Sequence, residues 1–308
     1  MNEAFTSQPN QYSLASFLPP GFTIPEANVS HIRRRWLDIA YAGESPAQAL
    51  DIYLPDEGEG PFPVVFHIHG GAFAFGDKRD AGVEPFLSGL REGFAVVSAN
   101  YRLSQEATFP AGLKDLKTAL RWLRAHAAEF KLDPGRVAAC GPSAGGYFVA
   151  MLCVTEGIEE FEGAELGYPD QSSAVQAGVD WFGPTNFLTM DEQAVASGLG
   201  RAIHSLPGSP ESLFLGAPVC EALELARKAS PITNVRPGIA PLLVQHGRLD
   251  DLVPYQQSVE FVQAVREQAG ADRVEFDLFD EAGHMDPLFL TPENMARVFS
   301  FLIQRLRL

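Results

Sequence analysis

Apolar, β-prone runs alternate with helical stretches along most of this 308-residue chain. Such alternation is typical of a mostly parallel sheet whose strands are joined by crossover helices. The strand candidates are residues 36–41, 49–54, 63–69, 94–99, 136–140, 175–182, 242–246 and 274–279. We therefore expect an α/β fold with one doubly wound domain, in which an eight-stranded, mostly parallel sheet carries helices on both faces.

Three segments show helical periodicity. In residues 113–130, leucines recur at positions 113, 116, 120 and 123, which places them on one face of a helix. Residues 254–268 and 292–306 repeat this pattern. We expect an amphipathic helix in each of these segments.

Two parts of the chain depart from the alternation. Residues 1–30 contain Pro19, Pro20 and Gly21, which predicts an irregular N-terminal arm that packs on the body or covers a cleft. Residues 156–235 hold a single strand candidate and are rich in Gly, Pro, Ser and acidic residues, which favours loops and short helices at the carboxyl edge of the sheet. We therefore divide the chain into the arm, 1–30, and one domain, 31–308, in which 156–235 is partly cap-like.

Charge and cysteine content exclude several classes of function. The formal net charge of −16 argues against a nucleic-acid or anionic-membrane partner, since binding phosphates requires clustered Lys and Arg. The longest purely apolar run, residues 147–154, is far shorter than the ~18 residues of a membrane span. Cys140, Cys153 and Cys220 are odd in number and lack CxxC spacing, which favours free thiols in a reducing compartment. We expect a soluble, cytoplasmic protein, and the sequence leaves open whether it forms a homo-oligomer.

The sequence GPSAGG at 141–146 follows one strand candidate directly and precedes an apolar helical stretch. A serine at a sharp strand-to-helix turn needs small neighbours, and the helix N-terminus favours negative charge beside it. The alternative is a glycine-rich turn with an incidental serine. The strand-to-helix context favours Ser143 as a nucleophile.

The sequence HIHGGAF at 67–73 lies at the end of another strand candidate. Two adjacent glycines let backbone N–H groups turn toward a ligand, which an oxyanion hole requires. We expect N–H donors from Gly71 and Ala72, joined by Ala144 after the nucleophile. One alternative is a plain strand-to-loop turn. Another is a metal site at His67 and His69, whose imidazoles would share one face of the strand, but no matching carboxylate and histidine cluster follows.

Two later loops supply a carboxylate and an imidazole. Asp250 lies in HGRLDDLVP at 246–254, and His284 ends EAGH at 281–284, each after a strand candidate. A carboxylate at this edge of the sheet can orient an imidazole, and the usual pKa of histidine, about 6.5, suits proton transfer. The alternatives are that Asp250 caps the helix near Pro254 and that His284 is a surface residue. We expect Asp250 and His284 to complete a triad with Ser143.

The remaining residues near these motifs receive lesser roles. Asp251 is expected to cap the helix that begins near Pro254. His31, His126 and His204 are expected to be structural or exposed. Trp181, Phe182 and Met285 are candidates for lining a substrate pocket, with burial in the core as the alternative.

Together, these motifs resemble those of the α/β-hydrolase superfamily. More narrowly, the chain resembles carboxylesterases with an H-G-G motif, the hormone-sensitive-lipase-like and feruloyl- or acetyl-xylan-esterase-like groups. The resemblance covers residues 45–306 through the motifs at 69–73, 100–103, 109–111, 143–146, 181–184 and 246–254. Two residues depart from it: Ala72 stands where relatives often have a third glycine, and Pro142 where many have an acidic or polar residue.

The residues and the resemblance together predict a serine carboxylesterase for short-chain or aryl esters. Ser143 is expected to attack the ester carbonyl, with His284 as base, Asp250 holding the imidazole, and no metal or organic cofactor. The expected partner is a small-molecule ester. An amidase or arylformamidase with the same triad remains the nearest alternative, and a non-catalytic small-molecule receptor is an alternative of another class.

Overall fold

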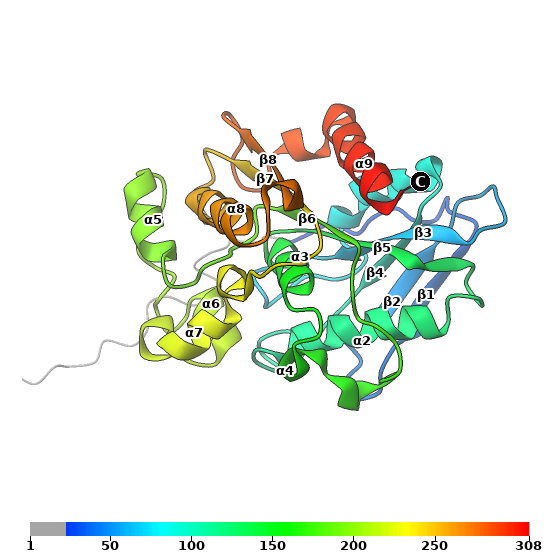
Figure 1. Cartoon of the computed structure of the whole chain (residues 1–308), viewed down its shortest axis with the longest axis horizontal. Helices are drawn as coiled ribbons and strands as arrows, with labels where there is room; N and C mark the ends of the chain where they lie inside the picture. Colours follow the sequence, from blue (N-terminus) through cyan, green and yellow to red (C-terminus); the bar gives the residue numbers. More distant parts are fainter. Residues whose placement is uncertain (1–22, 308) are drawn as a thin grey trace, which may run out of the picture.

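The computed structural model describes residues 23–307 and contains one eight-stranded sheet (Figure 1). Its strands stand in the order β1-β2-β4-β3-β5-β6-β7-β8. The two pairings β1–β2 and β2–β4 are antiparallel, and all others are parallel. The bounds are β1 Arg35–Ala40, β2 Ala49–Tyr53, β3 Phe62–Ile68, β4 Ala95–Ala99, β5 Leu132–Pro142, β6 Ala177–Trp181, β7 Leu242–Gly247 and β8 Val274–Phe279.

Helices cover both faces of this sheet, as expected from the sequence. Buried side chains of α2, α3 and α8 belong to one apolar cluster, and those of α1 and α9 belong to a second. Every residue of the central strands β3 and β4 is buried, because helices shield parallel strands on both sides. The helices are α1 Glu84–Leu87, α2 Ala111–Ala125, α3 Ala144–Val154, α4 Glu159–Glu162, α5 Met190–Ser197, α6 Pro210–Leu215, α7 Leu223–Ala229, α8 Gln256–Gln268 and α9 Pro292–Leu306.

The segment 156–235 contains β6 and several short helices. α5, α6 and α7 lie together at one end of the molecule, on the left of Figure 1. His204, Pro210 and Glu211 of this segment line the same cavity as Ser143. The segment therefore contributes part of the wall around the candidate site.

The described part of the expected arm, residues 23–30, packs on a loop of the domain. Glu26 forms an isolated β-bridge with Asp80, and the backbone N–H of Ala27 donates to Arg79 O at 2.7 Å. Ile24 reaches the cavity beside Ser143. Residues 1–22, including Pro19, Pro20 and Gly21, lie outside the described residues.

None of the helices within residues 23–307 combines the length and apolar character that crossing a membrane requires. Cys140 and Cys153 are buried thiols, and Cys220 is an exposed one.

Candidate active site

Ser143 occupies the turn between β5 and α3. Its backbone has φ 54° and ψ −120°, a left-handed conformation that costs energy for any residue with a side chain. Two hydrogen bonds hold the turn: Ser143 N donates to Trp181 O at 2.8 Å, and Tyr147 N donates to Ser143 O at 2.9 Å. A Cβ atom at Gly145 would lie 2.2 Å from Ile68 O, so this position has room for glycine alone. The turn therefore holds the serine hydroxyl above the start of α3.

Three side chains from distant parts of the chain meet above this turn. His284 Nε2 lies 3.1 Å from Ser143 Oγ, and His284 Nδ1 lies 2.7 Å from Asp250 Oδ2. His284 follows β8 and Asp250 follows β7, whose carboxyl ends lie at the same edge of the sheet as that of β5. This is the geometry in which an imidazole can accept a hydroxyl proton while a carboxylate fixes its orientation.

Asp250 is buried, and both of its carboxylate oxygens are occupied. Oδ1 accepts hydrogen bonds from Leu252 N at 2.9 Å and Val253 N at 2.8 Å. Oδ2 faces His284 and also His246, whose Nε2 lies 3.2 Å away. Burial alone would raise the pKa of Asp250, but the charges and hydrogen bonds of His284 and His246 hold it well below its usual range. The side chain is therefore a fixed carboxylate at neutral pH.

The expected helix cap at Asp251 is wrong. α8 begins at Gln256, its N-cap is Tyr255, and no side chain caps it. Asp250 instead closes the turn that leads into the helix through its bonds to Leu252 N and Val253 N. Asp251 is exposed.

The loop after β3 and the start of α3 together bring three unpaired backbone donors close to Ser143. Gly71, Ala72 and Ala144 all line the cavity beside the serine, and their N–H groups donate to no residue in the described part of the chain. Gly71 O accepts from Ala74 N at 2.9 Å and from Phe75 N at 3.0 Å, which folds the loop into a tight turn. The donors are therefore available to a negatively charged oxygen.

Several residues around this site have strained backbone conformations with positive φ. Of the nine non-glycine residues with positive φ in the described part of the chain, five are Ala72, Phe73, Ser143, Phe182 and Met285. Such conformations persist where surrounding structure enforces them, and they are common at functional sites.

The cavity beside Ser143 has a volume of about 320 Å³. Met285 lines it, as expected, and is 54% exposed. Trp181 and Phe182, the other two candidates, lie outside the lining and are buried, which is the alternative considered for them. Trp181 packs on Phe86 and Phe289 in the core, and the ring of Phe182 lies 4.8 Å from that of His284. Phe182 therefore packs against the imidazole of His284.

His67 and His69, considered above as metal ligands, are buried and hydrogen-bonded. His67 Nδ1 lies 2.8 Å from Ser98 Oγ, and His69 Nδ1 lies 2.7 Å from Gly70 O. Burial lowers the pKa of His67 to about 3 and the pKa of His69 to about 4. The His69 ring also stacks on Tyr101, with centroids 4.5 Å apart, so it supports the start of the glycine loop.

His204, expected to be structural or exposed, is a buried and hydrogen-bonded residue. It lines the cavity, and its Nδ1 lies 3.1 Å from Glu211 Oε1. The sequence carries no signal for this pair, because the segment around it lacks regular periodicity.

The loop that holds Gly71 and Ala72, the expected oxyanion donors, offers a matched pair of substitutions. Gly71→Ala is expected to lower kcat by about 10²–10³-fold, the usual effect of losing one oxyanion donor. The added Cβ would lie 2.0 Å from Phe75 O, and φ is 111°, so the loop must move. Ala72→Gly should leave kcat nearly unchanged, because glycine adopts the observed φ of 51° without strain and keeps the N–H.

Steady-state kinetics with one p-nitrophenyl ester tests both variants, with thermal unfolding as the folding control. A folded Gly71→Ala protein with normal kcat would contradict the role of Gly71 as an oxyanion donor.

Sheet order, the turn at Ser143 and the cavity at the carboxyl edge define an α/β-hydrolase fold, which confirms the expected fold class. The family model BD-FAE matches residues 50–265, and the chain belongs to this family.

Three proteins illustrate its similarities. The chain is 34% identical over 235 residues to the probable carboxylic ester hydrolase LipM of Mycobacterium tuberculosis, covering 75% of this chain and 51% of LipM. The chain thus spans about half the length of this curated relative. A truncated carbohydrate esterase from gut microbiota superimposes with a TM-score of 0.80 at 28% identity, covering 92% of this chain and 100% of that one. The bifunctional GH43-CE protein of Bacteroides eggerthii superimposes with a TM-score of 0.81 at 32% identity, covering 89% of this chain and 35% of that protein.

Proposed function

We propose that this protein is a serine carboxylesterase that hydrolyses short-chain or aryl carboxylic esters. The observation that carries this proposal is the hydrogen-bonded series Ser143, His284 and Asp250 beside a cavity lined by unpaired N–H groups. The names of similar proteins, a carboxylic ester hydrolase and a carbohydrate esterase, support ester substrates.

The proposed reaction passes through an acyl-enzyme. Ser143 Oγ attacks the ester carbonyl while His284 Nε2 takes the hydroxyl proton, and Asp250 holds the other imidazole nitrogen. The N–H groups of Gly71, Ala72 and Ala144 stabilise the negative oxygen of the tetrahedral intermediate. His284 then gives its proton to the departing alcohol. Water, deprotonated by the same imidazole, then attacks the acyl carbonyl. The imidazole returns this proton to Ser143 Oγ as the acid departs.

Neither a metal nor an organic cofactor has a role in this scheme, because protein groups move each proton and stabilise each charge. We also propose a reducing compartment, such as the cytoplasm, on the cysteine pattern and the buried thiols of Cys140 and Cys153.

Acyl-chain length tests the proposed substrate class. The cavity volume of about 320 Å³ lies near the lower end of small-molecule sites, and its walls are mostly apolar. We expect kcat/KM for p-nitrophenyl esters to be highest from acetyl to butyryl and to fall at least about tenfold by lauroyl, because longer chains exceed the cavity. A rise in kcat/KM toward lauroyl, or a jump in rate at a lipid–water interface, would contradict the short-chain assignment.

The amidase or arylformamidase alternative uses the same triad on a C–N bond. A p-nitrophenyl ester and a p-nitroanilide with the same acyl group separate the two activities. We expect much faster turnover of the ester. For each substrate, the rate acceleration is the ratio of the catalysed to the uncatalysed rate. An equal or larger rate acceleration for the anilide would favour an amidase over an esterase.

A further inference from the structure

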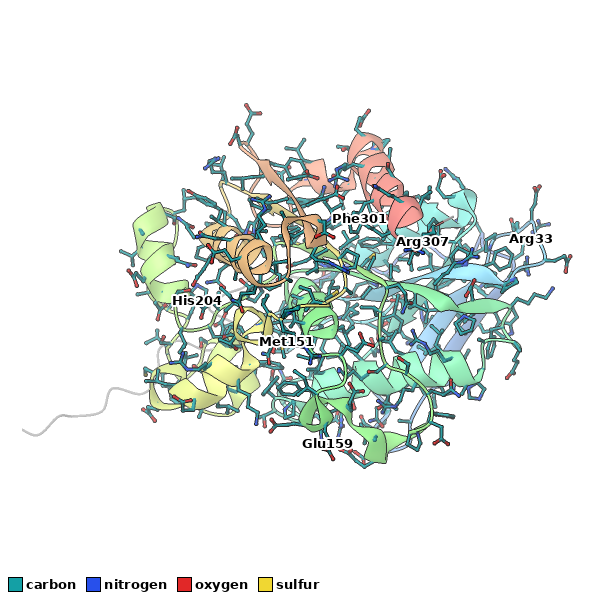
Figure 2. All side chains as sticks on the ribbon, viewed as in Figure 1. Arg33, Met151, Glu159, His204, Phe301 and Arg307 are labelled. Carbon is teal, nitrogen blue, oxygen red and sulfur yellow. The ribbon has the colours of Figure 1, made fainter. Side chains whose placement is uncertain are left out.

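A buried histidine–glutamate pair lines the cavity on the side formed by the segment 156–235. His204, labelled in Figure 2, lies in the loop between α5 and α6. Glu211 lies in the first turn of α6. Their Nδ1 and Oε1 atoms are 3.1 Å apart, and their side chains are 9% and 6% exposed. Both residues belong to the cavity that contains Ser143.

Each side chain of this pair has one polar atom that bonds to the other residue and one polar atom that does not. Glu211 Oε2 is buried and has no hydrogen-bond partner among the residues that the structure describes. His204 Nε2 makes no hydrogen bond with any residue from 23 to 307. Burial alone would lower the pKa of His204, but the nearby carboxylates of Glu211, Asp191 and Asp250 raise it above its usual value. A buried carboxylate oxygen without a partner is costly, so a polar group from outside the pair is expected to satisfy it.

Other contacts already hold the surrounding loop in place. Asp191 accepts hydrogen bonds from His204 N at 2.7 Å and Ser205 N at 3.0 Å. Ser209 Oγ donates to His204 O at 2.6 Å and accepts from Ser212 N, which caps α6. These hydrogen bonds hold the loop in place without the side chains of His204 and Glu211. The two side chains are therefore available to bind a ligand.

The other polar side chains of the cavity wall have identified partners. Ser143 and His284 bond to each other, His69 bonds to Gly70 O, and Asp80 accepts from Asp77 N at 2.7 Å. The remaining walls are largely apolar, with Ile24, Phe73, Pro184, Leu252, Val253 and Met285 among them. The pair is thus a localised polar position in an apolar cavity.

We propose that His204 and Glu211 form a subsite that binds a free hydroxyl group of the ester substrate. A hydroxyl both accepts and donates, so it can accept from Nε2–H of the protonated His204 imidazole, whose Nδ1–H faces Glu211 Oε1, and donate to the Glu211 carboxylate. An ester without that hydroxyl leaves the buried carboxylate unpaired and is discriminated against. This inference rests on the proposed esterase function and extends it to esters that carry a hydroxyl on the acyl or the alcohol part.

Matched substrates test the subsite in the unmodified protein. The acyl series compares p-nitrophenyl esters of 2-, 3- and 4-hydroxybutyrate with the butyrate. The alcohol series compares monoacetates of short diols with acetates of the corresponding simple alcohols. We expect kcat/KM to favour the hydroxylated ester by about tenfold to a hundredfold in at least one position, the range for a hydrogen bond to a charged group.

Three variants then separate recognition from a structural role. Glu211→Gln and His204→Gln are expected to reduce the preference, measured within each variant as the ratio of kcat/KM for the hydroxylated and plain esters, to within about twofold. Ser197→Ala is the control, because Ser197 Oγ donates to Ala194 O at the end of α5 and does not line the cavity. It should keep the preference.

Two outcomes would overturn the subsite: no preference in either series with the unmodified protein, or a full preference retained by folded Glu211→Gln. If no ester is hydrolysed at all, the proposed function fails instead. Titration of Ser143→Ala with the same substrate pairs then decides the subsite by the ratio of Kd values, which requires no turnover.

Discussion

Ser143→Ala is expected to lower kcat for ester hydrolysis by about 10⁶-fold, the loss known when the nucleophile of such a triad is removed. Without Oγ there is no acyl-enzyme, and the free imidazole of His284 cannot replace it. The fold should persist, since alanine occupies the same left-handed turn and both backbone hydrogen bonds of Ser143 remain.

A matched hydroxyl deletion provides the control for this prediction. Ser197 Oγ donates to Ala194 O at the end of α5 and does not line the cavity, so Ser197→Ala should keep its activity. A folded Ser143→Ala protein that retains a substantial fraction of the wild-type kcat would show that another group performs the hydrolysis.

Asp250→Asn is expected to lower kcat by about 10⁴-fold, as the same change does in a well-studied serine protease triad. The Asn oxygen can still accept from Leu252 N and Val253 N, which turns its NH₂ group toward His284 Nδ1. The imidazole must then accept at Nδ1 and carry its proton on Nε2. In that tautomer it cannot take the proton of Ser143.

Asp251→Asn is the matched control for this change. Asp251 is exposed and adjoins the triad acid without capping α8, so we expect little change in kcat. Kinetics and thermal unfolding of both variants decide the assignment. Near-normal turnover by Asp250→Asn beside a folded but inactive Asp251→Asn would reverse it.

Local sequence signals predicted the regular elements well. The bounds of β8, Val274–Phe279, and α9, Pro292–Leu306, match the expected segments 274–279 and 292–306. Both have clear periodicity and clear limits. α8 begins two residues later than expected, because the side chain of Asp250 ties Leu252 and Val253 into a turn first.

The residues that meet above the turn at Ser143 were also predicted, since each follows a strand that ends at the same edge of the sheet. Side-chain direction within a strand was harder to predict. Trp181 ends β6 as expected, but it faces the core beside Phe86 and Phe289. The pair His204 and Glu211 depends on how a segment without periodicity folds back on the sheet, which the sequence alone does not indicate.

Covalent labelling tests the proposed nucleophile most directly. A fluorophosphonate loses fluoride when a serine oxygen activated by a base attacks its phosphorus, and mass spectrometry of the digested protein locates the adduct. The proposed mechanism predicts one phosphonyl group per chain, on Ser143 Oγ, with much slower labelling of Asp250→Asn. An active protein that remains unlabelled, or that carries the adduct on a residue other than Ser143, would contradict it.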